Sequence, residues 1–385
     1  MSSTNFTGEF PRCIGHMQSL NALHLFLCQF MGELPSSFWN LTQLTYLCIS
    51  YNNFSGQNSP SLSNLQNLTV LDFSPNNFSG QFPSGCFTLP SLEIVDISSN
   101  HFTGQIGEIS SYSLEPLDVC ENKLYGLIPL SVFQLQNLTF FNLYHNFLIG
   151  NVLFHQLSWI NMYFLDLSSN FLQGELLSSI CNASTLDILN LSHNHFTGTI
   201  SHCIISSSLA LSILDLQMNS FSGTILESFE AENNLRTLNL NGNLLEGSLP
   251  ESLVNCTRLK VLDLGNNGLV DVFSQWLQAL EELQNQLEGC IPKGQQFGTF
   301  SSDSFSGNSE LRGFLLIIPC ISHKESQPPL PNFEVGFEFR WILVVMGYAC
   351  GVAFGATMFQ VLIFIGKPLW IASMVKDLPR EEQKG

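Results

Sequence analysis

Charged side chains are scarce in this chain, and basic ones especially so. They make up 11% of the 385 residues, and 13 Lys and Arg stand against 31 Asp and Glu, a formal net charge of −18. Nucleic-acid binding depends on clustered Lys and Arg that neutralise phosphates, so this composition excludes it. The hydrophobic fraction of 45% is too high for a disordered chain.

The residue patterns of common catalytic and metal sites are also missing. None of the 11 cysteines forms a C-x-x-C pair, which excludes the usual zinc and redox motifs. No kinase motif, phosphate loop or activated nucleophile is present. We therefore expect no enzyme activity, no metal and no cofactor.

A repeat of about 24 residues fills most of the chain instead. Glycine recurs at positions 8, 32, 56, 80, 104, 126, 150, 174, 198, 223, 247 and 289. Asparagine usually stands four residues earlier, at 52, 76, 100, 122, 146, 170, 194, 219, 243 and 285, and Asn267 keeps this phase although Asp271 replaces its glycine. These positions define thirteen units.

Each unit predicts one coil of a parallel superhelix. The alternation in Leu238-Asn239-Leu240 is typical of a strand with its leucines inward. A coil cannot bury its apolar face alone, so the coils must stack. We expect the asparagine to satisfy buried backbone groups, the glycine to adopt a shape that a side chain would obstruct, and a following proline to lie at an irregular outer edge.

These residues resemble the plant extracellular class of leucine-rich repeats, as in Phe164 to Leu176, FLDLSSNFLQGEL. The resemblance covers residues 1–292. It implies an α/β repeat fold, a right-handed superhelix with a parallel sheet on the concave side and 3₁₀ turns or irregular segments behind. We expect this solenoid over residues 1–293, then a cap and acidic stalk over 294–340.

Several positions depart from the repeat. Thr4 and Cys28 replace asparagine, and the unit ending at Gly126 is two residues short. The last unit is shorter still, so we expect an internal deletion there. The start of the chain lacks the basic and apolar stretches of a signal peptide, so we also expect a missing upstream segment. The cap resembles that of plant receptor-like proteins, but Arg312 stands at the place of its first cysteine and leaves Cys320 without its usual partner.

One segment near the end predicts a transmembrane helix. Residues 341–365 carry no formal charge, and at about 1.5 Å per residue they cross a hydrocarbon core of about 30 Å. Residues 366–385 then form a short cytosolic tail that is too small for a kinase domain. Gly347, Gly351 and Gly355 share one helix face, where a second helix could approach, and the resemblance implies a receptor kinase as that partner.

Asn-x-Ser/Thr sequons, together with a membrane span, favour a glycoprotein whose repeats are extracellular at the plasma membrane. The expected glycosylation sites are Asn5, Asn40, Asn53, Asn67, Asn77, Asn137, Asn182 and Asn255. We expect a ninth sequon, at Asn190, to stay unused, because it points from the concave sheet.

Two side-chain groups have less specific explanations. His193, His195, His202 and Cys203 lie close in sequence, but His193 and His195 fill ordinary repeat positions, which favours repeat phase over a metal site. Scattered cysteines such as Cys48, Cys86 and Cys181 are typical of small buried apolar residues.

The leading hypothesis is a kinase-less receptor of plant defence or development, with a peptide, protein or glycan ligand on the concave sheet. Two alternatives remain open: a soluble inhibitor of a secreted enzyme, and a non-signalling remnant of a receptor gene. The outward side chains that we expect to contact a ligand are Asp72, Ser74, Asp96, Ser98, Phe140, Asn142, Tyr144, Asp166, Asp215, Gln217, Thr237 and Asn239.

Overall fold

The computed structural model describes residues 3–269, apart from 5, 57–61, 155–158, 177, 205–209, 226–228 and 231–232, together with 289–290 and 311–312. The chain divides into two compact units, Met1–Ile321 and Ser322–Gly385, and every described residue belongs to the first. The expected transmembrane helix 341–365, its glycines and the tail lie outside the described residues. Within the described ranges, no helix is long and apolar enough to cross a membrane.

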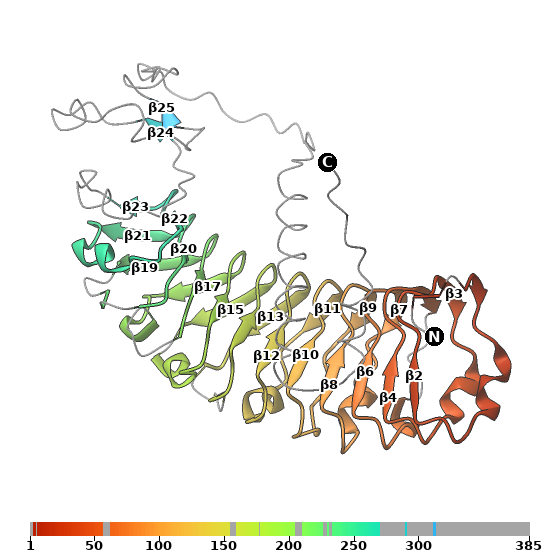
Figure 1. Cartoon of the computed structure of the whole chain (residues 1–385). Helices are drawn as coiled ribbons and strands as arrows, with labels where there is room; N and C mark the ends of the chain where they lie inside the picture. The colour runs from red at the N-terminus through yellow and green to blue at the C-terminus, as the bar shows by residue number, and fades with distance from the viewer. Residues whose placement is uncertain are drawn as a thin grey trace, which may run out of the picture. The chain divides into compact units, whose positions relative to one another are not determined.

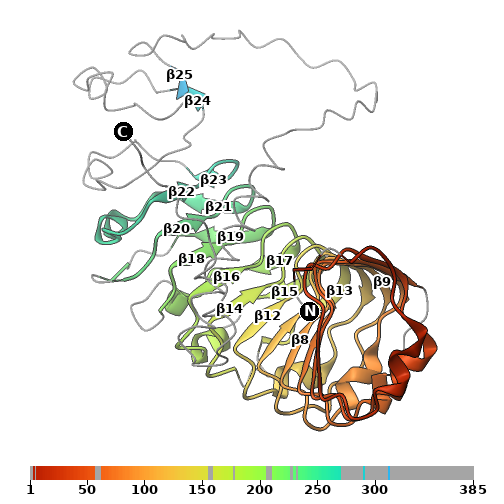
Figure 2. The same cartoon turned by 45° about the vertical axis from the view of Figure 1, so that its right-hand side comes forward.

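The predicted parallel sheet is present and has eleven strands, which follow one another along the stack in chain order (Figure 2). We call it the even-strand sheet, after its labels. Its strands are β2 (Ala22–His24), β4 (Tyr46–Cys48), β6 (Val70–Asp72), β8 (Ile94–Asp96), β10 (Pro116–Asp118), β12 (Phe140–Asn142), β14 (Phe164–Asp166), β16 (Ile188–Asn190), β18 (Ile213–Asp215), β20 (Thr237–Asn239) and β22 (Val261–Asp263).

A second parallel sheet has twelve strands (Figure 1). It occupies part of the segments behind the first sheet, where we expected 3₁₀ turns or irregular structure. This odd-strand sheet forms where each coil passes its asparagine and glycine. Its strands are β1 (Gly8–Glu9), β3 (Phe30–Glu33), β5 (Asn53–Gly56), β7 (Asn77–Gln81), β9 (His101–Gly104), β11 (Lys123–Gly126), β13 (Phe147–Asn151), β15 (Phe171–Glu175), β17 (His195–Gly198), β19 (Ser220–Thr224), β21 (Leu244–Gly247) and β23 (Gly268–Leu269).

Short 3₁₀ helices close the coils on their remaining side. They are η1 (Arg12–His16), η2 (Ser36–Asn40), η3 (Leu62–Asn64), η4 (Ser84–Thr88), η5 (Leu130–Gln134), η7 (Ser178–Asn182), η8 (His202–Ile204) and η9 (Glu251–Asn255). Pro35, Pro83, Pro129 and Pro250 each directly precede one of them. A separate pair of short strands, β24 (Gly289–Cys290) and β25 (Leu311–Arg312), is also parallel.

The core runs between the two sheets. Leucines at the centre of the even strands, such as Leu47 and Leu71, are fully buried. Phe54, Phe78 and Phe102, at the equivalent inward position of the odd strands, stack with centroid separations of 6.2 and 6.0 Å. Each coil therefore buries its apolar side chains against its neighbours, as the repeat predicted.

The recurring asparagine has the predicted role. Nδ2 of Asn194 donates to the carbonyl oxygens of Leu167 in the preceding coil (2.9 Å) and of Leu191 in its own coil (3.2 Å). Its Oδ1 accepts from the backbone N–H of Leu172 at 2.9 Å. The side chain is 6% exposed, so these bonds satisfy backbone groups that water cannot reach.

Candidate functional site

The predicted ligand-contact residues all lie on or directly after strands of the even-strand sheet. Asp72, Asp96, Asn142, Asp166, Asp215 and Asn239 end their strands, and Phe140 and Thr237 begin theirs. Ser74, Ser98, Tyr144 and Gln217 stand two residues beyond the strand ends. The structure therefore gathers the twelve residues into three parallel columns on one outward sheet face.

The strand-end column is continuous, because its members pair in register from strand to strand. Asp72 pairs with Asp96, Asp96 with Asp118, and Asp118 with Asn142. From there to β22, Asp and Asn alternate: Asp118, Asn142, Asp166, Asn190, Asp215, Asn239 and Asp263. No Lys or Arg occurs in this column.

Asp118 escaped the sequence prediction, although it belongs to the same column. Its unit is two residues short, so counting a fixed period of 24 residues from Asp96 misses it. The strand alternation in Pro116-Leu117-Asp118 was the signal that could have found it.

Each carboxylate of this column also holds the chain that follows its strand. Oδ1 of Asp96 accepts from the backbone N–H of Ser98 at 3.0 Å and from its hydroxyl at 2.7 Å. Asp72 binds Ser74 in the same way, with both distances 3.1 Å. The hydroxyls of Ser74 and Ser98 are thus engaged within the sheet, and both residues are buried.

Burial raises the pKa of these carboxyl groups. Burial, together with the negative charge of Asp96, raises the pKa of Asp72 to about 6 and that of Asp118 to about 7. Burial also raises the pKa of Asp166 and that of Asp215 to about 6. The column is therefore an acidic strip whose charge changes near neutral pH.

An apolar column runs beside the acidic strip, and the sequence reading overlooked most of it. It consists of the first residue of successive even strands: Tyr46, Val70, Ile94, Pro116, Phe140, Phe164, Ile188 and Ile213. The rings of Phe140 and Phe164 stack at 4.3 Å with an angle of 9°. The outward face of the even-strand sheet therefore combines a carboxylate and amide strip with an apolar strip.

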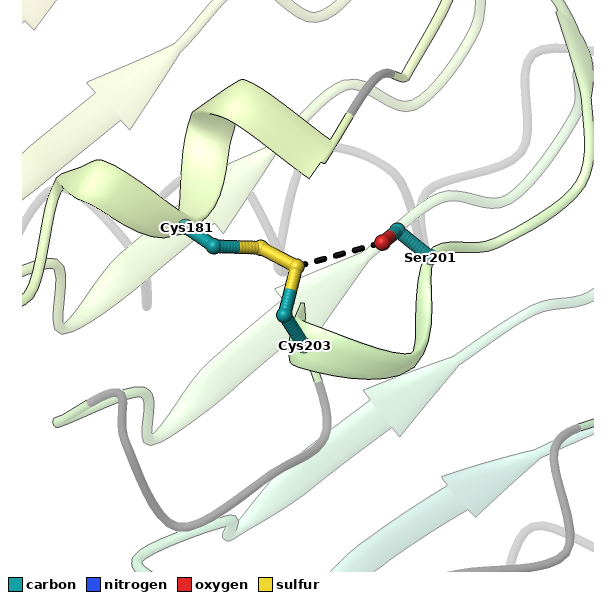
Figure 3. Close-up of a disulfide and its surroundings, with 3 residues drawn as sticks. All are labelled: Cys181, Ser201 and Cys203. Carbon is teal, nitrogen blue, oxygen red and sulfur yellow. Dashed lines mark hydrogen bonds between the residues drawn. A yellow bond between two sulfur atoms is a disulfide. The ribbon is translucent and has the colours of Figure 1, made fainter.

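The interpretation of Cys181 as a small buried apolar residue was wrong. Cys181 in η7 and Cys203 in η8 form a disulfide between consecutive coils, with Ser201 beside Cys203 (Figure 3). Disulfides of this kind persist in oxidising compartments. Cys48 and Cys86 are free and buried, as predicted.

The structure gives no support to a metal site near the histidines. Among the described residues, no group of three or more His, Cys, Asp or Glu side chains is placed to hold a metal ion. Cys203 is in the disulfide, while His193 lies in the turn after β16 and His195 begins β17.

Six of the expected glycosylation sites are exposed: Asn40, Asn53, Asn67, Asn77, Asn137 and Asn182. Asn255 is half-buried and donates to the carbonyl oxygen of Phe229 at 2.8 Å. Nδ2 of Asn190 donates to Oδ2 of Asp166 at 2.9 Å, inside the acidic strip. Asn5 lies outside the described residues.

Comparison with known proteins connects this geometry to a family. The Leucine Rich Repeat family model matches residues 43–65, 67–89, 161–183, 185–207 and 234–256. Receptor-like protein 18 of Arabidopsis thaliana is 47% identical over 51 residues, which are 13% of this chain and 6% of that protein. Receptor-like protein Cf-9 of Solanum pimpinellifolium is 33% identical over 87 residues, 21% of this chain and 10% of that protein.

Solved structures show the same fold over most of the chain. A TDR receptor is 32% identical with a TM-score of 0.67, covering 73% of this chain and 49% of that one. The PEPR1–AtPEP1 complex is 28% identical with a TM-score of 0.64, covering 81% and 48%. The ectodomain of the Arabidopsis thaliana receptor kinase GASSHO1/SCHENGEN3, in complex with CASPARIAN STRIP INTEGRITY FACTOR 2, is 26% identical with a TM-score of 0.66, covering 83% and 42%.

The stacked coils, their two parallel sheets and the matched repeats define a leucine-rich-repeat protein. Within that class, the matched segments are similar to plant receptor-like proteins, among them receptor-like protein 18 and Cf-9. The aligned segments span only 6–10% of these two relatives, and the chain covers less than half of each structure named above.

Proposed function

We propose that this protein is a kinase-less cell-surface receptor that binds an extended peptide on the outward face of the even-strand sheet. The observation that carries the proposal is the pairing of an acidic strip with an apolar strip over consecutive strands. Two of the similar structures are complexes, one of PEPR1 with AtPEP1 and one of a plant receptor kinase ectodomain with CASPARIAN STRIP INTEGRITY FACTOR 2. A regular sheet face suits an extended chain, because strand spacing of about 4.8 Å repeats along its whole length.

The chemistry of the face indicates what such a peptide carries. Asp72, Asp96 and Asp118 are consecutive carboxylates without an amide between them, which favours Lys or Arg on the ligand. Val70 and Ile94, beside them, favour apolar ligand side chains. We therefore propose a peptide in which basic and apolar residues both face the sheet.

Charge also changes sign along the sheet. Glu93 and Glu115 precede β8 and β10, whereas the exposed Arg236 and Lys260 precede β20 and β22. A peptide with a basic and an acidic end would bind in one orientation, with its acidic end towards the later coils.

A displayed peptide library tests this site without knowledge of the natural ligand. The full-length chain is immobilised and panned against phage carrying random twelve-residue peptides. We expect enriched peptides to contain more Lys and Arg than the input, and the triple substitution Asp72→Asn, Asp96→Asn and Asp118→Asn to abolish that excess.

A matched control removes the same formal charge from the odd-strand sheet. It carries Glu9→Gln, Glu33→Gln and Glu246→Gln, all on that second sheet. We expect it to enrich the same basic peptides as the unchanged chain. An equal loss in both triple variants, or no basic excess in the unchanged chain, would contradict the proposed binding face.

Signalling requires a further partner, since we propose that the chain has no enzyme activity of its own. The proposed partner is a receptor kinase that contacts the expected helix 341–365 through Gly347, Gly351 and Gly355. Changing all three glycines to Leu should abolish co-purification with a membrane kinase while membrane insertion is retained. Retained co-purification would place the contact elsewhere.

A further inference from the structure

An apolar patch lies on the outward face of the odd-strand sheet, whereas the acidic strip lies on the even-strand sheet. It consists of Tyr125, Leu127, Phe147, Ile149 and Phe171, whose exposed fractions lie between 48% and 63%. They come from β11, β13 and β15, three consecutive strands, and from the residue that follows β11. We call these five residues the lateral patch.

Other strands of the odd-strand sheet show that the repeat does not require apolar residues there. The same outward positions hold Asn53 and Ser55 in β5 and His195 and Thr197 in β17. A strand with one solvated face normally alternates apolar inward and polar outward residues. Met31 in β3 and Leu244 in β21 are single exposed apolar residues, whereas the lateral patch brings such residues together on three consecutive strands.

In the strands of the lateral patch, aromatic residues occupy outward positions and not the inward ones. In β5, β7 and β9 the inward residue is a phenylalanine, whereas in β11, β13 and β15 it is Leu124, Leu148 or Leu172. The core thus loses rings while the surface gains Tyr125, Phe147 and Phe171. Core packing therefore does not explain the outward rings.

The side chains of the lateral patch form one continuous surface. Tyr125 is the register partner of Phe147, and Ile149 is the partner of Phe171. Phe147 and Phe171 stack at 6.3 Å with an angle of 15°. Leu127 lies directly over Gly150, where an added Cβ would meet Leu127 Cδ2. Contiguous exposed apolar surface of this kind marks an interaction site.

The distribution of sequons leaves this surface open. Asn53 and Asn77 begin β5 and β7 and carry Asn-x-Ser sequons, so glycans there would project from the earlier part of the sheet. The equivalent positions in β9 to β17 are His101, Lys123, Phe147, Phe171 and His195, which carry none.

Opposite charges stand at two opposite corners of the patch. The exposed Lys123 begins β11, the first of the three strands, and the exposed Glu175 ends β15, the last of them. Ile149 lies between them at the centre of β13. Consider a two-fold axis that lies in the plane of the patch, passes through Ile149 and is perpendicular to the line from Lys123 to Glu175. Rotation about this axis places the Lys123 of each copy against the Glu175 of the other copy.

We propose that the lateral patch is an interface between two copies of this chain. The patch is self-complementary under that axis, since apolar meets apolar at the centre and each corner meets its opposite charge. This interface leaves the even-strand sheet free, so pairing and ligand binding can occur together. A shifted register would separate each Lys123 from the Glu175 of the other copy, which disfavours other pairings.

Disulfide trapping tests the position of the axis. The full-length chain is expressed in plant cells with Ile149→Cys, exposed to a mild oxidant and separated on a non-reducing gel. Ile149 is close to its own copy across the axis, so we expect a species of twice the chain mass. The matched control is Leu244→Cys, because Leu244 is 64% exposed on β21 of the same sheet but outside the patch.

The dimer band with Ile149→Cys should exceed that with Leu244→Cys at least several-fold. Equal trapping of the two variants would overturn the proposal. So would a product of Ile149→Cys whose mass differs from twice the chain, because it would show a different partner on this surface.

Charge reversal tests the corner contacts through two epitope tags and co-immunoprecipitation. Lys123→Glu alone and Glu175→Lys alone each place like charges together, so neither variant should recover a second copy of itself. Mixed with each other, however, these variants restore both opposite-charge contacts and should recover one another at close to the unchanged level.

The mixed pair uses the same two proteins that fail alone, so its recovery excludes misfolding as the cause of failure. Failure of the mixed pair, or undiminished self-association of either single variant, would contradict the two-fold interface. The double variant Lys123→Glu/Glu175→Lys should also recover itself.

Discussion

The side-chain amide of Asn142 donates to Oδ2 of Asp118 in the preceding strand at 3.1 Å. Asn190 repeats this contact on Asp166 at 2.9 Å, and so does Asn239 on Asp215 at 3.3 Å. From Asp118 onward an amide therefore alternates with each carboxylate, and adjacent strands do not oppose like charges. Asp72 and Asp96 interrupt the alternation, because Asp72, Asp96 and Asp118 follow one another directly.

This run of three carboxylates makes stability depend on pH. A carboxyl whose pKa rises on folding binds its proton more tightly in the folded state. Its contribution to the free energy of unfolding is therefore full below the usual pKa of 3.8 and is lost as pH rises through the folded pKa. With the pKa of Asp72 at about 6 and that of Asp118 at about 7, we expect stability to fall between pH 4 and pH 7.

Asp96→Asn should remove much of that dependence. Asn190 shows that an asparagine in this column still accepts from the following Ser N–H and hydroxyl, at 3.1 and 2.8 Å. At pH 8 we expect the variant to gain about 1 kcal/mol, the value of roughly one pKa unit, and at pH 4 to match the unchanged chain. Denaturant unfolding at the two pH values measures the difference. A variant that is less stable at pH 8 would contradict the repulsion.

The strand alternation and the asparagine period predicted the even-strand sheet and its outward column, because both follow from residues that recur in every coil. The odd-strand sheet was not predicted. Its strands contain a glycine with positive φ, for example Gly150 at 89°, which breaks the simple two-residue alternation. Asp118 was missed because register is set by stacking contacts, not by counting residues.

Contacts between particular side chains were harder to predict than the positions of those residues on the sheet. The Cys181–Cys203 disulfide depends on where two 3₁₀ helices stack, and no sequence period reports that distance. The hydroxyls of Ser74 and Ser98 were expected to face a ligand, yet they hydrogen-bond the neighbouring carboxylates. Such contacts depend on side-chain rotamers that a repeat pattern does not specify.

Asn194→Ala should destabilise the solenoid by about 1–3 kcal/mol, because it leaves buried backbone groups in two coils without partners. Asn151→Ala is a suitable control, since Asn151 is an exposed asparagine at the end of β13. Hydrogen exchange should show faster opening centred on the coils of Leu167 and Leu191, because coupling in a solenoid is between nearest neighbours. Identical thermal unfolding of the two variants would count against the role of this asparagine.

Met218 occupies a left-handed backbone conformation, with φ of 51°, in the turn directly before the recurring Asn219. The next coils place Gly242 and Asn266 at the same position, with φ of 68° and 51°. Asparagine tolerates this region better than methionine, so Met218→Asn should stabilise the protein by about 0.5–1 kcal/mol. Met17→Asn is the control, because Met17 is also exposed but has φ of −81°. A stabilisation of equal size in both variants would show that the exposed asparagine side chain, and not the backbone conformation, causes the effect.

The Cys181–Cys203 disulfide closes a loop with a sequence separation of 22 and joins two coils that otherwise meet through backbone pairing and packing. Closing a loop of that length restricts the unfolded chain, and loss of the bond should cost about 3 kcal/mol. We expect the double variant Cys181→Ala/Cys203→Ala to unfold at a lower temperature than the unchanged protein. A reducing agent should lower the unfolding temperature of the unchanged protein but not that of the double variant. Mass spectrometry of peptides from the non-reduced protein should recover the two cysteines joined. Recovery of both as free thiols would show that the coils stack without the bond, and the double variant should then unfold like the unchanged protein.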